Sequence, residues 1–210
     1  YDKNPDVSLQ DGFGQTVFHY LANGWSTYLL KIMSKKGVQK GINKADNDKR
    51  TALSIAVSRR QHAIVKLLLS MGADPNSKDK FDRSLLYVSF TKNDYRLVKL
   101  LVEKGIDINN KFGTGIYPLM KAITMRNHFI VKLLLKNKAD IKIKDSKGQS
   151  PLALAVEKRL AHITKLILDA GGNPNGRDKN GKPLLLVAYN KFHIWTFNHL
   201  IKAKANPNIQ

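Results

Sequence analysis

The chain has 210 residues, of which 36 are Lys or Arg and 16 are Asp or Glu, so its formal net charge is +20. The absence of cysteine excludes disulfides and thiolate metal sites, and it leaves both oxidising and reducing compartments open. No apolar run approaches the roughly 18 residues that a membrane-spanning helix needs, and no signal sequence is visible.

The first residue is Tyr1 instead of Met, which fits a processed or trimmed product whose removed segment held an address. A periplasmic or secreted location is compatible with the lack of cysteine, and so is a cytoplasmic one. Both locations therefore stay open as expectations.

One pattern recurs along the chain at a spacing of 33 residues. A helix-start column consists of Thr51, Ser84, Tyr117, Ser150 and Pro183, and a leucine column of Leu53, Leu86, Leu119, Leu152 and Leu185. An earlier copy, of 35 residues, starts near Asp11. A unit this short cannot bury its own apolar face, so it must stack on copies of itself into a solenoid.

The best preserved copy shows the predicted elements in chain order. An Asp-x-x-Gly loop starts at Asp145, and Ser150 then supplies a hydroxyl cap for a helix that has Pro151 at its first position. A second helix carries an apolar stripe. It ends at Gly171, because glycine readily adopts the left-handed backbone conformation that closes a helix. The same glycine signal at Gly72 and Gly105 ends the second helix of two earlier copies.

These elements resemble the ankyrin repeat: an Asp-x-x-Gly finger, a Thr-Pro-Leu-His type helix start, a Val-x-x-Leu-Leu second helix and a Gly-Ala-Asp-x-Asn exit. The resemblance covers nearly the whole chain. It implies an all-α solenoid of about six helix-turn-helix repeats with β-hairpin fingers, in a single domain. The expected segments are a lead-in at 1–10 and repeats at 11–44, 45–77, 78–110, 111–143, 144–176 and 177–210.

The acidic residues are concentrated at turn positions of the repeat. Half of the 16 acids lie there, namely Asp11, Asp46, Asp79, Asp145 and Asp178 at finger openings and Asp74, Asp107 and Asp140 at exits. The remaining surface is almost purely cationic, and such a field attracts acidic partners in a salt-dependent way. High net charge also keeps a chain soluble, and this simpler explanation stands beside the functional one.

The family's ligands usually contact the finger tips and the exposed side of each first helix. Projected onto this register, the resemblance places a partner-binding strip at Phe13, Arg50, Arg59, Phe81, Arg83, Lys92, Phe112, Thr114, Ile116, Met125, Lys147, Lys158, Lys182 and Lys191. Aromatic and Arg side chains in such a strip often dominate interface energetics. The alternatives are packing against a neighbouring finger for each Phe and a solvated face for each Lys.

Two segments break the pattern of the repeat. The fourth finger lacks the opening Asp and has Phe112, Ile116 and Tyr117 where polar or capping residues are expected, which indicates either a functional site or drift of the repeat. The last repeat has three aromatic residues on its second helix, which either fold into the core or form a contact surface: Phe192, Trp195 and Phe197. Near the start of the chain, Trp25 and Tyr28 are interpreted as capping core.

Candidate chemistry is weak throughout the chain. The segment 176–183 nearly spells a phosphate-binding loop, but Pro183 stands where the magnesium-binding hydroxyl belongs. The six histidines lack the spacing of metal ligands, and His19 is predicted to bond to backbone in the Thr-Pro-Leu-His position. No Ser/His/Asp arrangement falls in a plausible nucleophile turn. We therefore predict neither enzyme activity nor a cofactor or metal.

The leading hypothesis is a non-catalytic protein-binding module, monomeric by itself, that captures an acidic or amphipathic partner. It would act by occlusion, as an inhibitor or immunity protein does, and the partner could be an enzyme. A further resemblance is to bacterial ankyrin proteins that guard a cell against its own wall-cutting enzymes. The alternatives are binding to a polyanion (nucleic acid, an anionic glycan or a membrane surface) and a host-directed effector scaffold. Nucleic acid is disfavoured because regularly spaced aromatics for base stacking are few.

Overall fold

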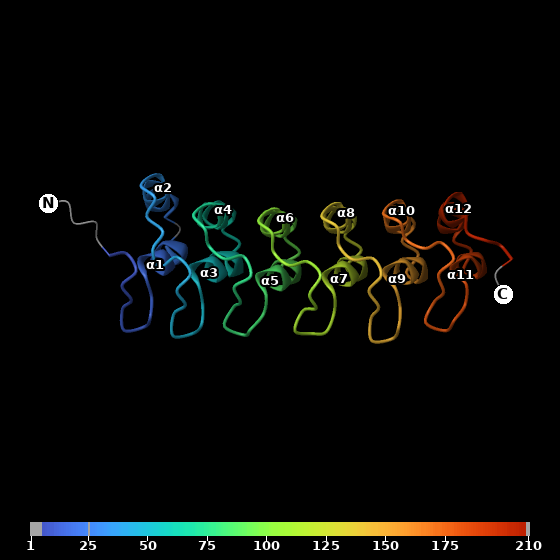
Figure 1. Ribbon diagram of the computed structural model, residues 1–210, viewed down its shortest axis with the longest axis horizontal. Helices are drawn as coiled ribbons and strands as arrows, with labels where there is room; N and C mark the ends of the chain where they lie inside the picture. The colour runs from blue at the N-terminus through green and yellow to red at the C-terminus, as the bar shows by residue number, and fades with distance from the viewer. Residues whose placement is uncertain (1–5, 25, 209–210) are drawn as a thin grey trace. The chain divides into compact units, whose positions relative to one another are not determined.

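The structure is a computed structural model that describes residues 6–24 and 26–208, and this part of the chain contains twelve helices (Figure 1). The chain forms two compact units, unit 1 within residues 1–107 and unit 2 within residues 108–210. The helices of unit 1 are α1 (Val17–Asn23), α2 (Thr27–Lys35), α3 (Ala52–Ser58), α4 (His62–Ser70), α5 (Leu85–Thr91) and α6 (Tyr95–Glu103). The helices of unit 2 are α7 (Pro118–Thr124), α8 (His128–Lys136), α9 (Pro151–Glu157), α10 (Ala161–Asp169), α11 (Leu184–Asn190) and α12 (Ile194–Lys202).

Each unit contains three helix pairs, and within a unit the pairs stack side by side. In unit 1, α3 packs between α1 and α5 while α4 packs between α2 and α6. In unit 2, α9 packs between α7 and α11 while α10 packs between α8 and α12. In both units the first helix of each pair lies between the second helix and a long loop, the finger (Figure 1).

The first helices start where the sequence predicts. The hydroxyl of Ser150 accepts a hydrogen bond from the N–H of Ala153 at 3.2 Å, and Pro151 follows at the first helical position. Thr51 and Ser84 cap α3 and α5 in the same way. These caps satisfy amide groups that would otherwise lack a partner at the helix start.

The histidine at the start of α1 has a structural role, as predicted. His19 is fully buried, and its Nδ1 accepts a hydrogen bond from the N–H of Thr16 at 3.0 Å. Its Nε2 therefore carries the proton, and it lies 2.9 Å from the carbonyl oxygen of Arg50 in the next repeat. The ring thus joins two repeats through their backbones.

The second helices end at left-handed residues. Gly72, Gly105 and Gly171 have φ angles of 90°, 79° and 92°, which confirms the predicted helix ends. Lys138 has the same register in unit 2 and adopts a φ of 63° without the freedom of glycine. Leu97, Val98 and Leu101 of α6 are examples of the fully buried apolar stripe of these helices.

An asparagine in the exit turn links one repeat to the next. The side-chain oxygens of Asn43, Asn76, Asn109 and Asn175 each accept a backbone N–H from 31 residues further along, at 2.8, 3.1, 2.9 and 2.7 Å respectively. Lys142 occupies this register between Asn109 and Asn175, and its side chain has no acceptor atom. The ladder is therefore interrupted inside unit 2.

Two predictions about the first repeat have different outcomes. Tyr28 was expected in a capping core, but its side chain is 72% exposed on α2, so this prediction is wrong. The register that makes α2 amphipathic buries Leu30 and turns Tyr28 outward. Trp25 lies outside the described residues. No helix in the described part of the chain has both the length and the apolar character needed to cross a bilayer.

Candidate functional site: a basic pocket on the finger side of unit 1

The fingers are held in shape by their opening aspartates. Oδ1 of Asp79 accepts hydrogen bonds from the N–H groups of Phe81 and Arg83, both at 3.0 Å. The same pair of bonds forms at Asp11, Asp46, Asp145 and Asp178. An antiparallel bridge closes three of these fingers, at residues 45 and 51, 78 and 84, and 177 and 183. Each tip is therefore presented by a loop whose backbone amides are bonded.

In unit 1 the second oxygen of the aspartate orients an arginine. Asp46 Oδ2 lies 2.8 Å from both Nε and a terminal nitrogen of Arg50. Asp79 Oδ2 lies 2.8 Å from Nε of Arg83 and 2.6 Å from a terminal nitrogen. Such paired contacts fix the plane of the guanidinium group.

The Asp79 carboxylate stays ionised in this arrangement. Burial raises the pKa of Asp79, but the hydrogen bonds from the Arg83 side chain and from the backbone outweigh burial and hold the pKa below its usual value. The Asp79 carboxylate therefore faces Arg83 as an anion at neutral pH.

Phe81 stands out at the tip of the third finger. Its side chain is 63% exposed, and Nζ of Lys80 and the guanidinium carbon of Arg83 lie 5.0 and 4.7 Å from the ring centroid. Cations at this distance are attracted to the ring face. The ring is therefore an exposed apolar surface held between two positive charges.

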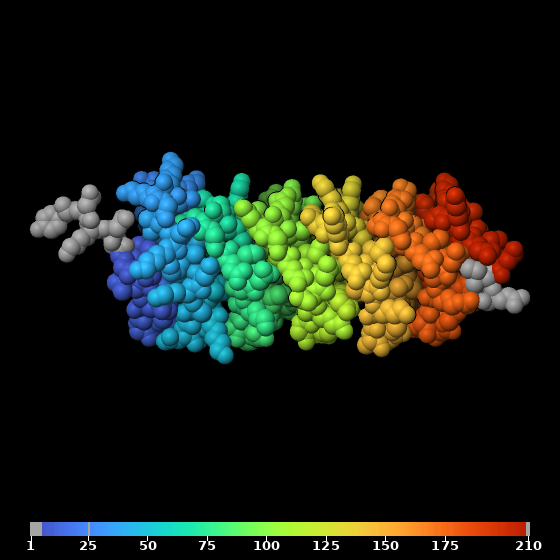
Figure 2. Space-filling view, in the orientation of Figure 1, coloured from blue at the N-terminus to red at the C-terminus, as the bar shows by residue number. Residues whose placement is uncertain are grey.

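These groups surround one pocket in unit 1, with a volume of about 250 Å³. Its lining residues come from the second and third fingers and from the first helices beside them: Asn23, Arg50, Ser54, Ile55, Ser58, Arg59, Asp79, Lys80, Phe81 and Arg83. Four of them are cations and one is a carboxylate. Arg59, at the end of α3, bonds to the carbonyl oxygen of Asn23 at 3.5 Å. The finger loops form the lower edge of each unit in Figure 2.

The pocket can hold an anionic group beside an apolar one. Three guanidinium groups and an ammonium group supply hydrogen-bond donors suited to carboxylates, and Phe81 supplies contact area. Ser58 of α3 adds an exposed hydroxyl group, whereas the hydroxyl of the buried Ser54 donates to the carbonyl oxygen of Thr51 at 2.9 Å.

Comparison with known proteins agrees with this repeat architecture. The family model for ankyrin repeats, in three copies, matches residues 1–79, 85–178 and 119–210. The chain belongs to the ankyrin repeat family. Ankyrin repeats generally act as protein–protein interaction modules, and the fold is typically a non-catalytic scaffold.

Solved ankyrin structures share the fold at low sequence identity. The ankyrin repeat domain of Bcl-3, a member of the IkappaB protein family, aligns with a TM-score of 0.70 and 24% identity, over 94% of this chain and 90% of that one. An ankyrin repeat domain from Acinetobacter baumannii AYE aligns with a TM-score of 0.73 and 23% identity, over 90% of this chain and 98% of that one. No curated protein sequence matches this ankyrin chain.

The structure brings four of the predicted strip residues together. Arg50, Arg59, Phe81 and Arg83 all line the ankyrin pocket of unit 1. Phe13 and Lys92 are exposed in the same unit but do not line it. Lys80 was missed, because its position of the repeat holds Gly, Asn or Ser in four of the six copies and therefore draws no attention.

In unit 2 one predicted site residue is wrong. Phe112 is only 5% exposed, so its ring cannot contact a partner. It occupies the register of the opening aspartates, whose carboxylates bond to backbone amides of their own fingers, and the Phe at this position is buried. The fourth finger keeps its backbone turn, since Phe112 N–H still donates to the carbonyl of Ile116 at 2.9 Å.

The other predicted residues of unit 2 lie at the surface. Thr114, Ile116 and Lys147 are exposed, whereas Met125, Lys158, Lys182 and Lys191 are half-buried. Nζ of Lys191 donates to the backbone carbonyl of Glu157 at 3.4 Å, and Nζ of Lys179 lies 3.5 Å from its carboxylate. A hydrogen bond from Gln149, followed by the charge of Lys179, lowers the pKa of Glu157. Part of this positive charge is thus neutralised within unit 2.

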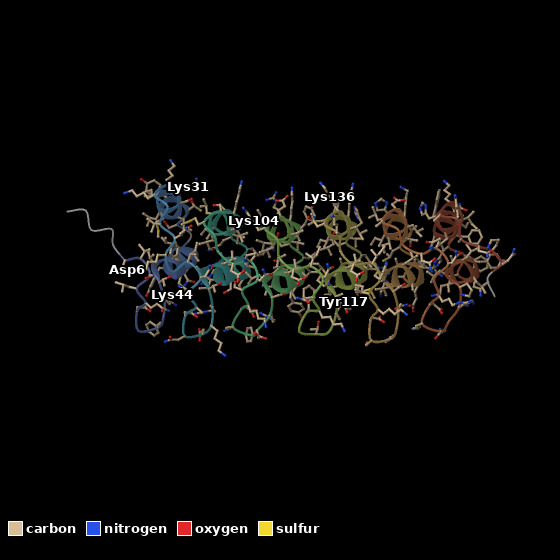
Figure 3. All side chains as sticks on the ribbon, viewed as in Figure 1. Asp6, Lys31, Lys44, Lys104, Tyr117 and Lys136 are labelled. Atoms are coloured by element: carbon tan, nitrogen blue, oxygen red, sulfur yellow. The ribbon has the colours of Figure 1, made fainter. Side chains whose placement is uncertain are left out.

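The second helices carry charge on the side away from the fingers. Lys31 of α2 and Lys136 of α8 lie on this side, while Tyr117 lies next to the fourth finger (Figure 3). The ladder of Lys66, Lys99, Lys132 and Lys165 is exposed on these second helices. Positive charge therefore lies on both sides of the described chain, and in unit 1 the pocket combines it with an exposed aromatic ring and a lined cavity. Among the described residues no three His, Asp or Glu side chains are placed to share a metal ion.

Proposed function

We propose that this ankyrin protein binds an acidic partner protein through the basic pocket on the finger side of unit 1. The observation that supports the proposal is the convergence of Arg50, Arg59, Arg83 and Phe81 on one pocket. Arg and aromatic side chains supply much of the binding energy in protein interfaces when they lie close together. An acidic side chain of the partner would pair with the guanidinium groups while a neighbouring apolar side chain covers Phe81.

The pocket is preorganised for such a ligand. The Asp46–Arg50 and Asp79–Arg83 pairs fix two guanidinium groups before any partner arrives. Arg59 and Lys80 are exposed, and no carboxylate in the described chain forms an ion pair with either of them. Binding therefore orders few side chains and leaves two cations for the partner's carboxylates.

We further propose that the protein acts by occlusion, as an inhibitor or immunity protein does. The surface offers binding groups without catalytic ones, so covering a partner's functional surface is the effect it can produce. If the captured partner is an enzyme, an equimolar amount of this protein should suppress its activity.

The test is capture of protein from the source cell at several salt concentrations. The wild-type protein should retain an acidic protein at low ionic strength, and retention should fall as salt screens the charges. The variant Arg59→Glu/Lys80→Glu should lose that protein, because both changes reverse exposed charges that hold no finger aspartate. Lys31→Glu/Lys66→Glu is the matched control, with the same net charge but both changes on second helices, and it should retain the partner.

Two outcomes would reject the proposal. Equal loss of the partner in both double variants would mean that net charge alone attracts it. Retention that disappears after nuclease treatment or with competitor DNA would instead assign the protein to polyanion binding.

A further inference from the structure

A second surface, here called the turn edge of unit 2, combines exposed rings with cations. It is formed by residues at equal registers in the turns before α8, α10 and α12 and in the first turns of these helices. Its residues are Arg126, Phe129, Arg159, His162, Phe192 and Trp195. The three helices pack side by side, with α10 between α8 and α12 (Figure 1). Side chains at equal registers of these stacked repeats therefore point to the same side.

The turn edge is exposed because of its register and not because the sequence ends. Arg159 is exposed although the sixth repeat follows it. Phe129 of α8 is 61% exposed although α10 packs against α8, and His162 is exposed on α10, which has a helix on either side. Trp195 and Phe192 hold the same registers in the last repeat and are 73% and 90% exposed. The stacking of repeats therefore leaves this edge open.

Two aromatic residues of the last repeat are thus surface residues. Trp195 lies in the first turn of α12, whereas Phe192 lies in the turn before α12 and not on that helix. Phe197, further along α12, is half-buried. Of the two interpretations from the sequence, the contact surface applies to Trp195 and Phe192.

The fold does not require rings at these positions. In the second and third repeats the register of Phe129 holds Ala63 and Arg96, which are both exposed. A ring in water gains no stability from burial, so its value must come from a contact outside the repeat stack. The ring centroid of His128 lies 3.9 Å from that of Phe129 and 5.3 Å from that of His162. The aromatic row is therefore continuous from α8 to α10.

Cations flank the aromatic row. The fourth and fifth repeats each have a cation three residues before and three residues after the ring, and these cations are Arg126, Lys132, Arg159 and Lys165. Among the described residues, Lys165 is the one of these four that pairs with a carboxylate, at 3.3 Å from Asp169. Segments 124–132, 157–165 and 190–198 contain one acid, Glu157, which lies 3.5 Å from Lys179. The turn edge therefore has excess positive charge.

A hollow in the turn edge places a guanidinium group next to apolar side chains. It has a volume of about 320 Å³, with Arg159 and Ala161 on one side and Phe192, Ile194 and Trp195 among the residues of the other. A terminal nitrogen of Arg159 donates to the carbonyl oxygen of residue 191 at 3.3 Å, and the remaining N–H groups can meet a ligand. The hollow can therefore hold an anionic group beside a hydrocarbon chain.

An anionic bilayer surface is complementary to this combination of groups. Rings with apolar bodies enter the boundary between headgroups and acyl chains, while Lys and Arg meet the headgroup phosphates. A single strand of nucleic acid also combines rings with cations, but its bases stack on the ring faces. An exposed aliphatic side chain such as Ile194, at 70%, has no part in base stacking, whereas it can enter a lipid layer. The observations therefore favour the bilayer.

We propose that the turn edge of unit 2 binds the surface of a bilayer that contains anionic phospholipid. Phe129, Phe192 and Trp195 enter the boundary between headgroups and acyl chains. Arg126 and Arg159 contact headgroup phosphates, and the hollow receives one headgroup beside Arg159. This surface is separate from the pocket of unit 1, so either proposal stands if the other fails.

The test measures binding of the full chain to vesicles of phosphatidylcholine alone and of an equimolar mixture with phosphatidylglycerol. The protein should bind the mixed vesicles at least about tenfold more strongly, because several cations meet anionic headgroups. Added salt should weaken this binding. Trp25→Phe leaves Trp195 as the one tryptophan, and its fluorescence should shift to shorter wavelength on the mixed vesicles.

A pair of variants tests the rings. Phe129→Ser/Trp195→Ser should weaken binding to the mixed vesicles about tenfold or more, because two apolar side chains no longer enter the lipid. The melting temperature should stay the same, since both rings are exposed. Phe13→Ser/Ile116→Ser is the control, with two exposed apolar side chains of the fingers, and should bind like the wild type.

A second pair of variants tests the cations. Arg126→Glu/Lys132→Glu reverses the two charges on either side of Phe129 and should abolish binding to the mixed vesicles. Lys144→Glu/Lys147→Glu has the same net charge, but both changes lie in the exposed finger of the fifth repeat. This control should still bind.

Several results would overturn the proposal. Equal binding to both kinds of vesicle, or binding to neither, would exclude an anionic bilayer as the ligand. Unchanged emission of Trp195 on bound vesicles, or equal losses in a variant and its control, would show that the turn edge is not the contact. Binding of single-stranded DNA in place of vesicles, lost in Phe129→Ser/Trp195→Ser, would assign the edge to nucleic acid instead.

Discussion

Single residues at repeated registers show which interactions this fold depends on. The exit asparagines link neighbouring repeats through one hydrogen bond each, and the finger aspartates bond two amides each. Where a repeat has a different residue type at one of these positions, the hydrogen bond that it lacks can be identified. Lys142 lacks the acceptor that Asn109 and Asn175 supply.

Lys142→Asn should therefore stabilise the protein. The new side chain would accept the N–H of Asn173, which has the register that Asp140 and Asn206 have in their turns. One such bond contributes about 0.5–1.5 kcal/mol to the free energy of unfolding, which chemical denaturation can measure. Lys144→Asn, two residues further along, is the control and should leave the stability unchanged. A decrease in stability for Lys142→Asn would show that the ladder does not contribute as described.

At the scale of elements, the turns between paired helices carry buried charge. Asp94 caps α6 through the N–H of Leu97 at 3.2 Å, and its carboxylate also binds Arg60 at 2.8 Å and His62 at 3.0 Å in the preceding turn. Burial raises the pKa of Asp94, but the hydrogen bonds from His62 and Arg60 outweigh burial and hold the pKa below its usual value.

This lowered pKa makes stability dependent on acid pH. A depressed folded-state pKa stabilises the protein above the unfolded pKa of about 4, and that contribution is lost as pH falls through the folded value. Asp94→Asn should cost about 1–3 kcal/mol at pH 7 and less at pH 3, as measured by urea unfolding. The helix cap itself should survive, because Asn127 caps α8 with the same geometry. Equal losses at both pH values would contradict the charge argument.

The packing of α6 allows a second prediction about the stability of the helices. Leu101 is fully buried where α6 packs on α4 and α5. Leu101→Ala should reduce the free energy of unfolding by about 2–5 kcal/mol and speed hydrogen exchange in α4, α5 and α6. Lys66→Ala on the exposed side of α4 is the control and should change neither quantity measurably. Unchanged exchange in these helices after Leu101→Ala would contradict the described core.

At the scale of the molecule, the sequence predicts the scaffold better than the site. The period of 33 residues locates helix starts such as Ser150 and helix ends such as Gly72, because every repeat uses the same caps. Arg50 and Arg83 could also be predicted, since they precede the first helices in register. That these two arginines line one pocket with Arg59 and Lys80 could not be predicted, because it depends on how closely the fingers and helices of neighbouring repeats approach one another. Phe112 was misassigned because the inward direction of its side chain cannot be seen in one sequence.

Positive charge alone does not identify the binding surface. A net charge of +20 extends over both the first and the second helices, so it attracts acidic molecules without selecting a site. We propose that selection comes from the pocket of unit 1, where two cations lie close to the ring of Phe81. The central claim is therefore that an acidic protein contacts Phe81 and not the equally exposed rings elsewhere in unit 1.

Site-specific photo-crosslinking tests this claim most directly. A photo-reactive amino acid replaces Phe81 in one variant and Tyr28 on α2 in the other, two exposed rings of the same unit (63% and 72%). When a lysate of the source cell is irradiated, an acidic protein should be joined to position 81, with a yield that falls as the salt concentration is raised before irradiation, and no such adduct should form at position 28. The same adduct at both positions, or at position 28 alone, would contradict the account.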